Sequence, residues 1–123
     1  MKTPKLTGWL LAGIAASRFL GLAAGEPAPT YENNVRPILE KSCFKCHGDK
    51  KQKAQLRLDT YEALMKGSGN GLIVDLANTG NSMMLKLISL EPGDEDIMPP
   101  KGRPLSSKNI QIIRAWVEGG AKP

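Results

Sequence analysis

Apolar residues recur every three or four positions in several short stretches, which is the spacing of one face of an α-helix. The first stretch follows Thr30, a residue type that caps helices well, and it leads directly to residue 43. Pro37 lies inside this stretch and predicts either a kink or a helix confined to the residues after 36. Its apolar positions are Tyr31, Val35, Ile38 and Leu39.

Two shorter helices are predicted in the middle of the chain. One has Asp59 or Thr60 as its cap and ends at Gly67. The other has Asn81 or Ser82 as its cap. Their apolar residues are Tyr61, Leu64 and Met65 in the first helix, and Met83, Met84, Leu87 and Ile88 in the second.

The last helix has the clearest signals at both ends. Ser106 is a good cap, and Leu105 and Ile110 occupy the two positions of a hydrophobic staple. Gly119 and Gly120 end the helix. Its apolar face consists of Ile110, Ile113, Trp116 and Val117, and we expect Trp116 to pack on the first helix.

The remaining segments are predicted to be loops. Residues 48–54 are polar and rich in lysine, residues 67–71 form a turn, and residues 91–104 contain four prolines. Short extended pieces are expected at 56–58 and 72–74. The sequence thus predicts an all-α domain of three to five short helices, whose long loops need something to pack against.

The first 24 residues have the pattern of an export signal, with a basic start, an apolar run and small residues at its end. Arg18 interrupts the apolar run and argues against a permanent membrane span, because a charge there costs about 2.5–3.5 kcal/mol. We therefore expect a cleaved signal at 1–24, a linker at 25–29 and a domain at 30–122, in a periplasmic or otherwise exported protein. An uncleaved anchor and a cytoplasmic start are the alternatives.

The formal charge of +5 depends largely on that signal, which contains three of the 17 basic residues and no acidic one. The other residues include 14 basic against 12 acidic side chains, a balance that does not favour nucleic-acid binding. No phosphate-binding loop and no Ser-His-Asp set is present in the sequence. We therefore do not expect an enzyme.

The run Cys43-Phe44-Lys45-Cys46-His47 is the clearest chemical feature of the chain. Cys-x-x-Cys-His is the attachment signature of c-type haem. Two thiols add to the two vinyl groups on one porphyrin edge, and the adjacent histidine binds the iron. A helical turn brings Cys43 and His47, four residues apart, to the same side. A disulfide or a zinc site is the alternative, although zinc usually requires four ligands.

No second histidine of this chain can bind the iron, because His47 is the only histidine, so methionine, lysine, water or an empty site remain for the other axial position. Met98 is the predicted ligand, since the prolines that follow it hold its segment in an extended, non-helical form. Lys101 is the fallback. Helical methionines more often fill a core, which is the expectation for Met65, Met83 and Met84. His/Met ligation stabilises ferrous iron and fills both axial positions, which favours electron transfer over catalysis.

The sequence resembles the planctomycete-type cytochrome c domain, a small monohaem c-type cytochrome, over about residues 30–122. The pieces that carry the resemblance lie at 35–39, 43–48, 56–59, 82–85, 98–100 and 105–121. The resemblance implies a cytochrome c-like fold wrapped around one covalent haem c, with His47 and Met98 as axial ligands. It also implies apolar packing positions for Met83 and Met84. The chain departs from the family at 74–80, where a Pro-Gly turn is missing.

These observations predict an exported monohaem cytochrome that carries single electrons. A dedicated haem subunit of a periplasmic dehydrogenase or oxidase, and a gas or redox sensor with a labile Met98, are the alternatives. A group of lysines surrounds the motif and indicates either a docking surface for an acidic redox partner or a solvated loop. These lysines are Lys41, Lys45, Lys50, Lys51 and Lys53. The acidic run at 94–96 is expected to be a solvated turn.

Overall fold

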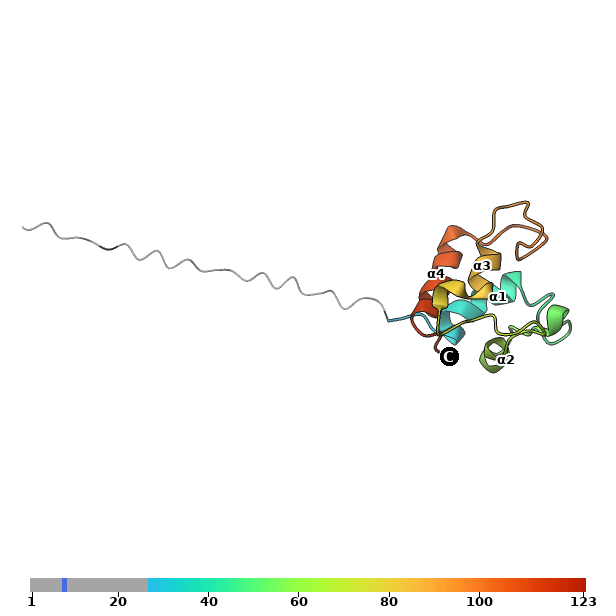
Figure 1. Cartoon of the computed structure of the whole chain (residues 1–123), viewed down its shortest axis with the longest axis horizontal. Helices are drawn as coiled ribbons and strands as arrows, with labels where there is room; N and C mark the ends of the chain where they lie inside the picture. Colours follow the sequence, from blue (N-terminus) through green and yellow to red (C-terminus); the bar gives the residue numbers. More distant parts are fainter. Residues whose placement is uncertain (1–7, 9–26) are drawn as a thin grey trace, which may run out of the picture.

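The structure is a computed structural model that describes Gly8 and residues 27–123. The described residues form four α-helices and no strand (Figure 1), namely α1 (Arg36–Ser42), α2 (Tyr61–Lys66), α3 (Met83–Ile88) and α4 (Ser107–Glu118). Single turns of π- or 3-10 helix add η1 (Tyr31–Val35), η2 (Lys53–Gln55) and η3 (Thr79–Asn81). The all-α prediction is confirmed. The expected signal peptide lies outside the described residues, apart from Gly8.

The first helical stretch divides at Pro37, as its position in the sequence predicted. Proline has no N–H, and its ring would crowd the carbonyl four residues before it in a regular α-helix. The chain solves this with one wider turn, in which the Arg36 N–H donates to the carbonyl of Tyr31, five residues back. The regular helix α1 then begins at Arg36, with proline in its first turn. Thr30 caps the whole stretch, and its hydroxyl accepts from the Asn33 N–H at 3.2 Å.

Side-chain caps at α2 and α4 are those that the sequence predicted. Thr60 accepts from the backbone N–H three residues into α2, and Ser106 does the same at the start of α4. Ser82 precedes α3, but its hydroxyl makes no cap hydrogen bond. It accepts instead from the Asp75 N–H at 2.9 Å, and Ser82 is fully buried. Ser82 therefore occupies the N-cap position, as one of the two predicted alternatives, but its side chain fastens the loop before α3 instead of capping the helix.

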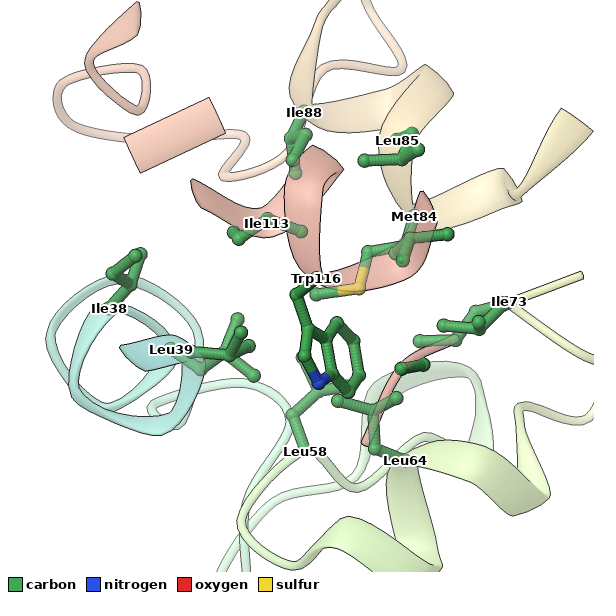
Figure 2. Packing of buried hydrophobic residues seen from close by; sticks show 14 of the residues in the cluster. Ile38, Leu39, Leu58, Leu64, Ile73, Met84, Leu85, Ile88, Ile113 and Trp116 are labelled. Atoms are coloured by element: carbon green, nitrogen blue, oxygen red, sulfur yellow. The ribbon is translucent and has the colours of Figure 1, made fainter. Parts of the chain in front are cut away.

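Trp116 lies in the middle of the buried cluster. Figure 2 shows side chains from other segments, including Leu39, Leu64 and Met84, directed toward its indole ring. Its ring also packs on Tyr31 in η1, with ring centroids 6.3 Å apart, which confirms the predicted contact with the first helix. Burial of such aromatic and aliphatic surface is the main source of stability in a domain of this size.

Two expectations about apolar residues were wrong. Met83 is 48 % exposed and does not fill the core, whereas Met84 is buried. Met83 is the first residue of α3, and the helix buries the three residues Met84, Leu85 and Ile88 instead. The run at 72–74 is not extended either, because the chain bends at Ile73 and Val74; these two residues are buried, whereas Leu72 is 65 % exposed.

The end of the chain folds back onto its first helical turn. The Lys122 carbonyl accepts hydrogen bonds from the Tyr31 N–H at 2.9 Å and from Trp116 Nε1 at 2.7 Å. The hydroxyl of Tyr61 donates to the Ala121 carbonyl at 2.8 Å. The C-terminus therefore lies beside the start of η1 (Figure 1). Among residues 27–123, no helix has the length and apolar character needed to span a bilayer.

Candidate haem-binding site

The Cys-x-x-Cys-His run forms a single tight turn at the end of α1. The Cys43 N–H closes the helix with a 2.7 Å bond to the Leu39 carbonyl. The Cys43 carbonyl then accepts from the N–H of Cys46 at 3.1 Å and from that of His47 at 2.9 Å. This last bond spans four residues, so Cys43 and His47 stand one helical turn apart, as their spacing predicted.

Gly48, which follows the motif, has a steric role. A Cβ atom at this position would lie 2.5 Å from the Phe44 carbonyl oxygen, a backbone atom that cannot move aside cheaply. The Gly48 N–H also donates to the Lys51 carbonyl at 2.8 Å, which turns the chain away from the motif. Only glycine therefore allows the chain to leave His47 in this direction.

The His47 ring is oriented by a backbone carbonyl. Its Nδ1 lies 3.0 Å from the carbonyl oxygen of Lys53, which can only accept a hydrogen bond, so Nδ1 carries the proton. The lone pair is then on Nε2, and no hydrogen bond within the described residues involves Nε2. Burial lowers the pKa of His47, although the nearby backbone groups of Lys53 and Leu56 act in the opposite direction. The imidazole is thus neutral near pH 7, the form that binds metals.

The two thiols are free and half-buried. Burial is the main factor that raises the pKa of Cys43 to about 11, and the neighbouring Cys46 adds to it. In the described part of the chain, no three His, Cys, Asp or Glu side chains gather into a metal site. The motif itself offers two thiols and one histidine, which is fewer than the four ligands of a structural zinc site.

Two further backbone bonds tie the segment after the motif to the motif itself. The Lys53 N–H donates to the Cys46 carbonyl at 2.9 Å, and the Leu58 N–H donates to the His47 carbonyl at 2.9 Å. We call residues 43–58 the histidine frame. The sequence predicts only a loop at residues 48–54 and not this frame, because backbone groups leave no residue-type signal in a sequence.

Met98 lies in a different segment, residues 91–104, which we call the methionine loop. The Met98 N–H donates to the Leu87 carbonyl near the end of α3 at 3.1 Å. The preceding residue, Ile97, is buried, while the Met98 side chain is half-buried and packs at the edge of the core cluster, as Cys43 does. The structure therefore places the two cysteines and His47 on one turn and Met98 on a separate loop. Lys101 is exposed.

The residues present fit a c-type haem. Two free thiols and a histidine with an uncommitted Nε2 share one turn, and the absence of a Cβ at Gly48 is what allows that turn. An all-α fold built on such a turn defines a small cytochrome c-like domain. A family model described as Planctomycete cytochrome C matches residues 43–102, which include both cysteines, His47 and Met98. The chain carries a planctomycete-type cytochrome c domain.

This family membership makes the domain a haem-binding electron carrier and implies haem c as its cofactor. The matched residues leave out η1, α1 and α4, although all three contribute to the same buried cluster. No curated protein and no solved structure gives a significant match to the chain.

Proposed function

We propose that this protein is an exported monohaem c-type cytochrome that carries single electrons. Cys43 and Cys46 would form the thioether links, and His47 and Met98 would be the protein ligands of the iron. The observation that carries the proposal is the bond from His47 Nδ1 to the Lys53 carbonyl. It leaves Nε2 as a metal ligand on the same turn that bears both thiols.

The haem supplies the one-electron couple, and the residues of the chain set its surroundings. The histidine frame fixes the imidazole tautomer, and a hydrogen-bonded Nδ1–H makes Nε2 a better donor. The methionine loop offers a thioether, a ligand that favours ferrous iron. With a side chain at each axial position the iron has no open site, so we expect no catalysis there.

An electron carrier needs a redox partner, and the charges around the motif favour a partner with an acidic surface. The five lysines at 41, 45, 50, 51 and 53 are all exposed. The acidic run of the methionine loop is exposed as well and forms a local turn, in which the Asp94 carboxylate accepts from the Asp96 N–H at 2.9 Å. We propose that the lysines steer a redox protein with an acidic docking surface.

A second candidate is a dedicated haem subunit of a larger redox enzyme. Three large apolar side chains are exposed between the end of α2 and the start of α3, namely Leu72, Leu76 and Met83. Isolated exposed apolar residues are common, but such groups also occur at protein interfaces. Stable co-purification with one dehydrogenase or oxidase, lost on Leu72→Ser, would support this role over that of a free carrier.

The test of axial ligation compares two methionines. Met98→Ala should abolish the weak red absorption band of the ferric protein and lower the reduction potential, because the thioether that favours ferrous iron is gone. Met83→Ala is the matched control, since Met83 is exposed and should leave both unchanged. An unchanged spectrum in Met98→Ala would assign the ligand to another residue.

A further inference from the structure

Lys53 holds the motif with both of its backbone groups. Its N–H donates to Cys46 and its carbonyl accepts from the His47 ring, at 2.9 and 3.0 Å. The orientation of the Lys53 peptide therefore decides whether the imidazole keeps its hydrogen-bond partner. The Lys53 side chain is exposed and takes no part in either bond.

The two residues that follow have an unusual backbone conformation. Ala54 has φ 57° and ψ 22°, and Gln55 also has φ 57°. Only one other non-glycine residue in the described part of the chain, Ala121, has a positive φ. Side chains disfavour this left-handed region, so the surrounding structure has to maintain it.

The maintaining contact comes from a distant turn. The Gly69 N–H donates to the Ala54 carbonyl at 2.8 Å. Gly69 is presented by a closed turn, in which the Ser68 N–H bonds to the Gly71 carbonyl and the Gly71 N–H bonds back to Ser68. The Gln55 side chain lies directly over Gly69, since a Cβ there would be 2.5 Å from its amide oxygen.

Packing does not explain the conformation of the pair. Ala54 and Gln55 are exposed, and a hollow of about 450 Å³ lined in part by Gln52, Gln55 and Gly69 opens beside them. Local turn bonds run from the Gln55 N–H to the Gln52 carbonyl at 3.0 Å and from the Leu56 N–H to the Lys53 carbonyl at 3.2 Å. The backbone bond from Gly69 is the contact that a distant segment adds to them. A left-handed pair held from outside is typical of a segment whose geometry serves a functional site.

We infer that Ala54 and Gln55, anchored by the Gly69 N–H, are positioning residues for His47. Their left-handed backbone turns the Lys53 carbonyl toward Nδ1 and so sets the donor strength of the imidazole. The inference rests on the proposed role of His47 as axial ligand. It predicts that residues 54 and 69, which are not iron ligands, influence the reduction potential of the haem through the Lys53 carbonyl.

The test uses substitutions at Ala54 that differ in their tolerance of a positive φ. Ala54→Asn tolerates it, Ala54→Thr tolerates it less, and Ala54→Val least. Because Ala54 is exposed, these changes act on the backbone and not on core packing. Ala77→Val is the matched control, since Ala77 is also exposed and its φ is not positive.

Two readouts on the haem-loaded variants report the His47 bond directly. NMR of the ferric protein gives the exchange rate of the Nδ1 proton, and voltammetry gives the potential. In Ala54→Val the exchange should be about tenfold faster, as expected for a bond that opens more often. The equilibrium should also shift toward ferrous iron, because a weaker Nδ1–H bond makes His47 a poorer donor to ferric iron.

Both the exchange rate of the Nδ1 proton and the reduction potential should increase in the order Ala54→Asn, wild type, Ala54→Thr, Ala54→Val. Ala77→Val should equal the wild type in both. Ala54→Thr keeps the test decisive if Ala54→Val does not acquire haem. Equal exchange rates and potentials across the Ala54 series would overturn the inference. If His47 were not the ligand, its ring protons would lack large paramagnetic shifts even in the wild type, which separates failure of the proposed function from failure of this inference.

Discussion

The histidine frame and the methionine loop offer a comparison between two ways of holding a side chain. In the frame, both the N–H and the carbonyl of His47 make backbone hydrogen bonds, and its ring is hydrogen-bonded as well. In the methionine loop, one backbone bond, from Met98 to Leu87, connects the candidate ligand to a helix. Several backbone bonds thus hold the frame, whereas a single backbone bond ties Met98 to α3.

This difference matches the role that we propose for each segment. Two thioether bonds and an imidazole require three side chains in one fixed arrangement, which only a closed turn provides. A thioether ligand requires a single sulfur on a flexible side chain, and a loop with one anchor suffices for that. We therefore expect loss of the frame's thiols to abolish assembly, and disruption of the loop to alter only the properties of the assembled protein.

The largest effect should come from the frame's own thiols. Cys43→Ala combined with Cys46→Ala removes both attachment points, so covalent haem should be absent. Acid–acetone extraction should then remove all haem from any protein that retains it. Haem that remains with the polypeptide after extraction would show that these cysteines are not the attachment sites.

The next largest effect should come from the glycine that follows the motif. Gly48→Ala would place a Cβ 2.5 Å from the Phe44 carbonyl, and the displaced turn should cost about 2–3 kcal/mol of stability. Gly80→Ala is the control, because a Cβ at Gly80 meets nothing within 4 Å. Denaturant titration of the holo-proteins measures both. Equal midpoints for the two variants would mean that the turn at Gly48 is not tight.

The methionine loop should open before the rest of the molecule does. With one backbone anchor to α3, it belongs to the least stable part of the structure. In a guanidinium titration of the ferric protein, the red band should therefore disappear at a lower concentration than the helical signal. Coincident loss of the two signals would indicate that Met98 is held as firmly as the frame.

A smaller effect should follow from loosening the frame at its far end. The Tyr31 hydroxyl donates to the buried Leu58 carbonyl at 2.6 Å, and the Leu58 N–H in turn binds His47. Tyr31→Phe leaves that carbonyl unpaired and should cost about 1–2 kcal/mol, measured by denaturant at neutral pH. The red band should survive, since the methionine loop is untouched.

The same variant carries a pH signature. Burial raises the pKa of Tyr31 to about 12, above its unfolded value of about 10. The stability that this group contributes is therefore complete below pH 10 and is lost as the pH rises through about 12. Tyr31→Phe should show a shallower loss of stability over this interval. An equally steep loss in both proteins would place the alkaline titration elsewhere.

Helices and caps were the predictable part of this molecule. Thr30, Thr60 and Ser106 have side-chain acceptors suited to a helix start, and each caps a helix as expected. Ser82 has the same chemistry but lies close to the Asp75 N–H, and that tertiary contact prevailed. A local signal predicts a local bond only where no distant partner competes for it.

The site was predictable only at the level of side chains. The motif identified Cys43, Cys46 and His47, and all three lie within the residues that the family model matches. The role of Met98 stays a prediction. Neither the carbonyl that holds His47 nor the distant N–H that holds Ala54 has a signature in the sequence. Both depend on backbone conformation, and a positive φ at alanine or glutamine goes against the preference of the residue itself.

The Lys122 carbonyl, which accepts bonds from Tyr31 and from Trp116, has one more consequence. It brings the first and last segments of the folded region side by side, so the polypeptide enters and leaves the domain at neighbouring points. A domain with neighbouring ends can be inserted into a surface loop of another protein with little distortion of that protein. The same small electron-carrying unit is thus suited by its geometry to become a building block of larger redox assemblies.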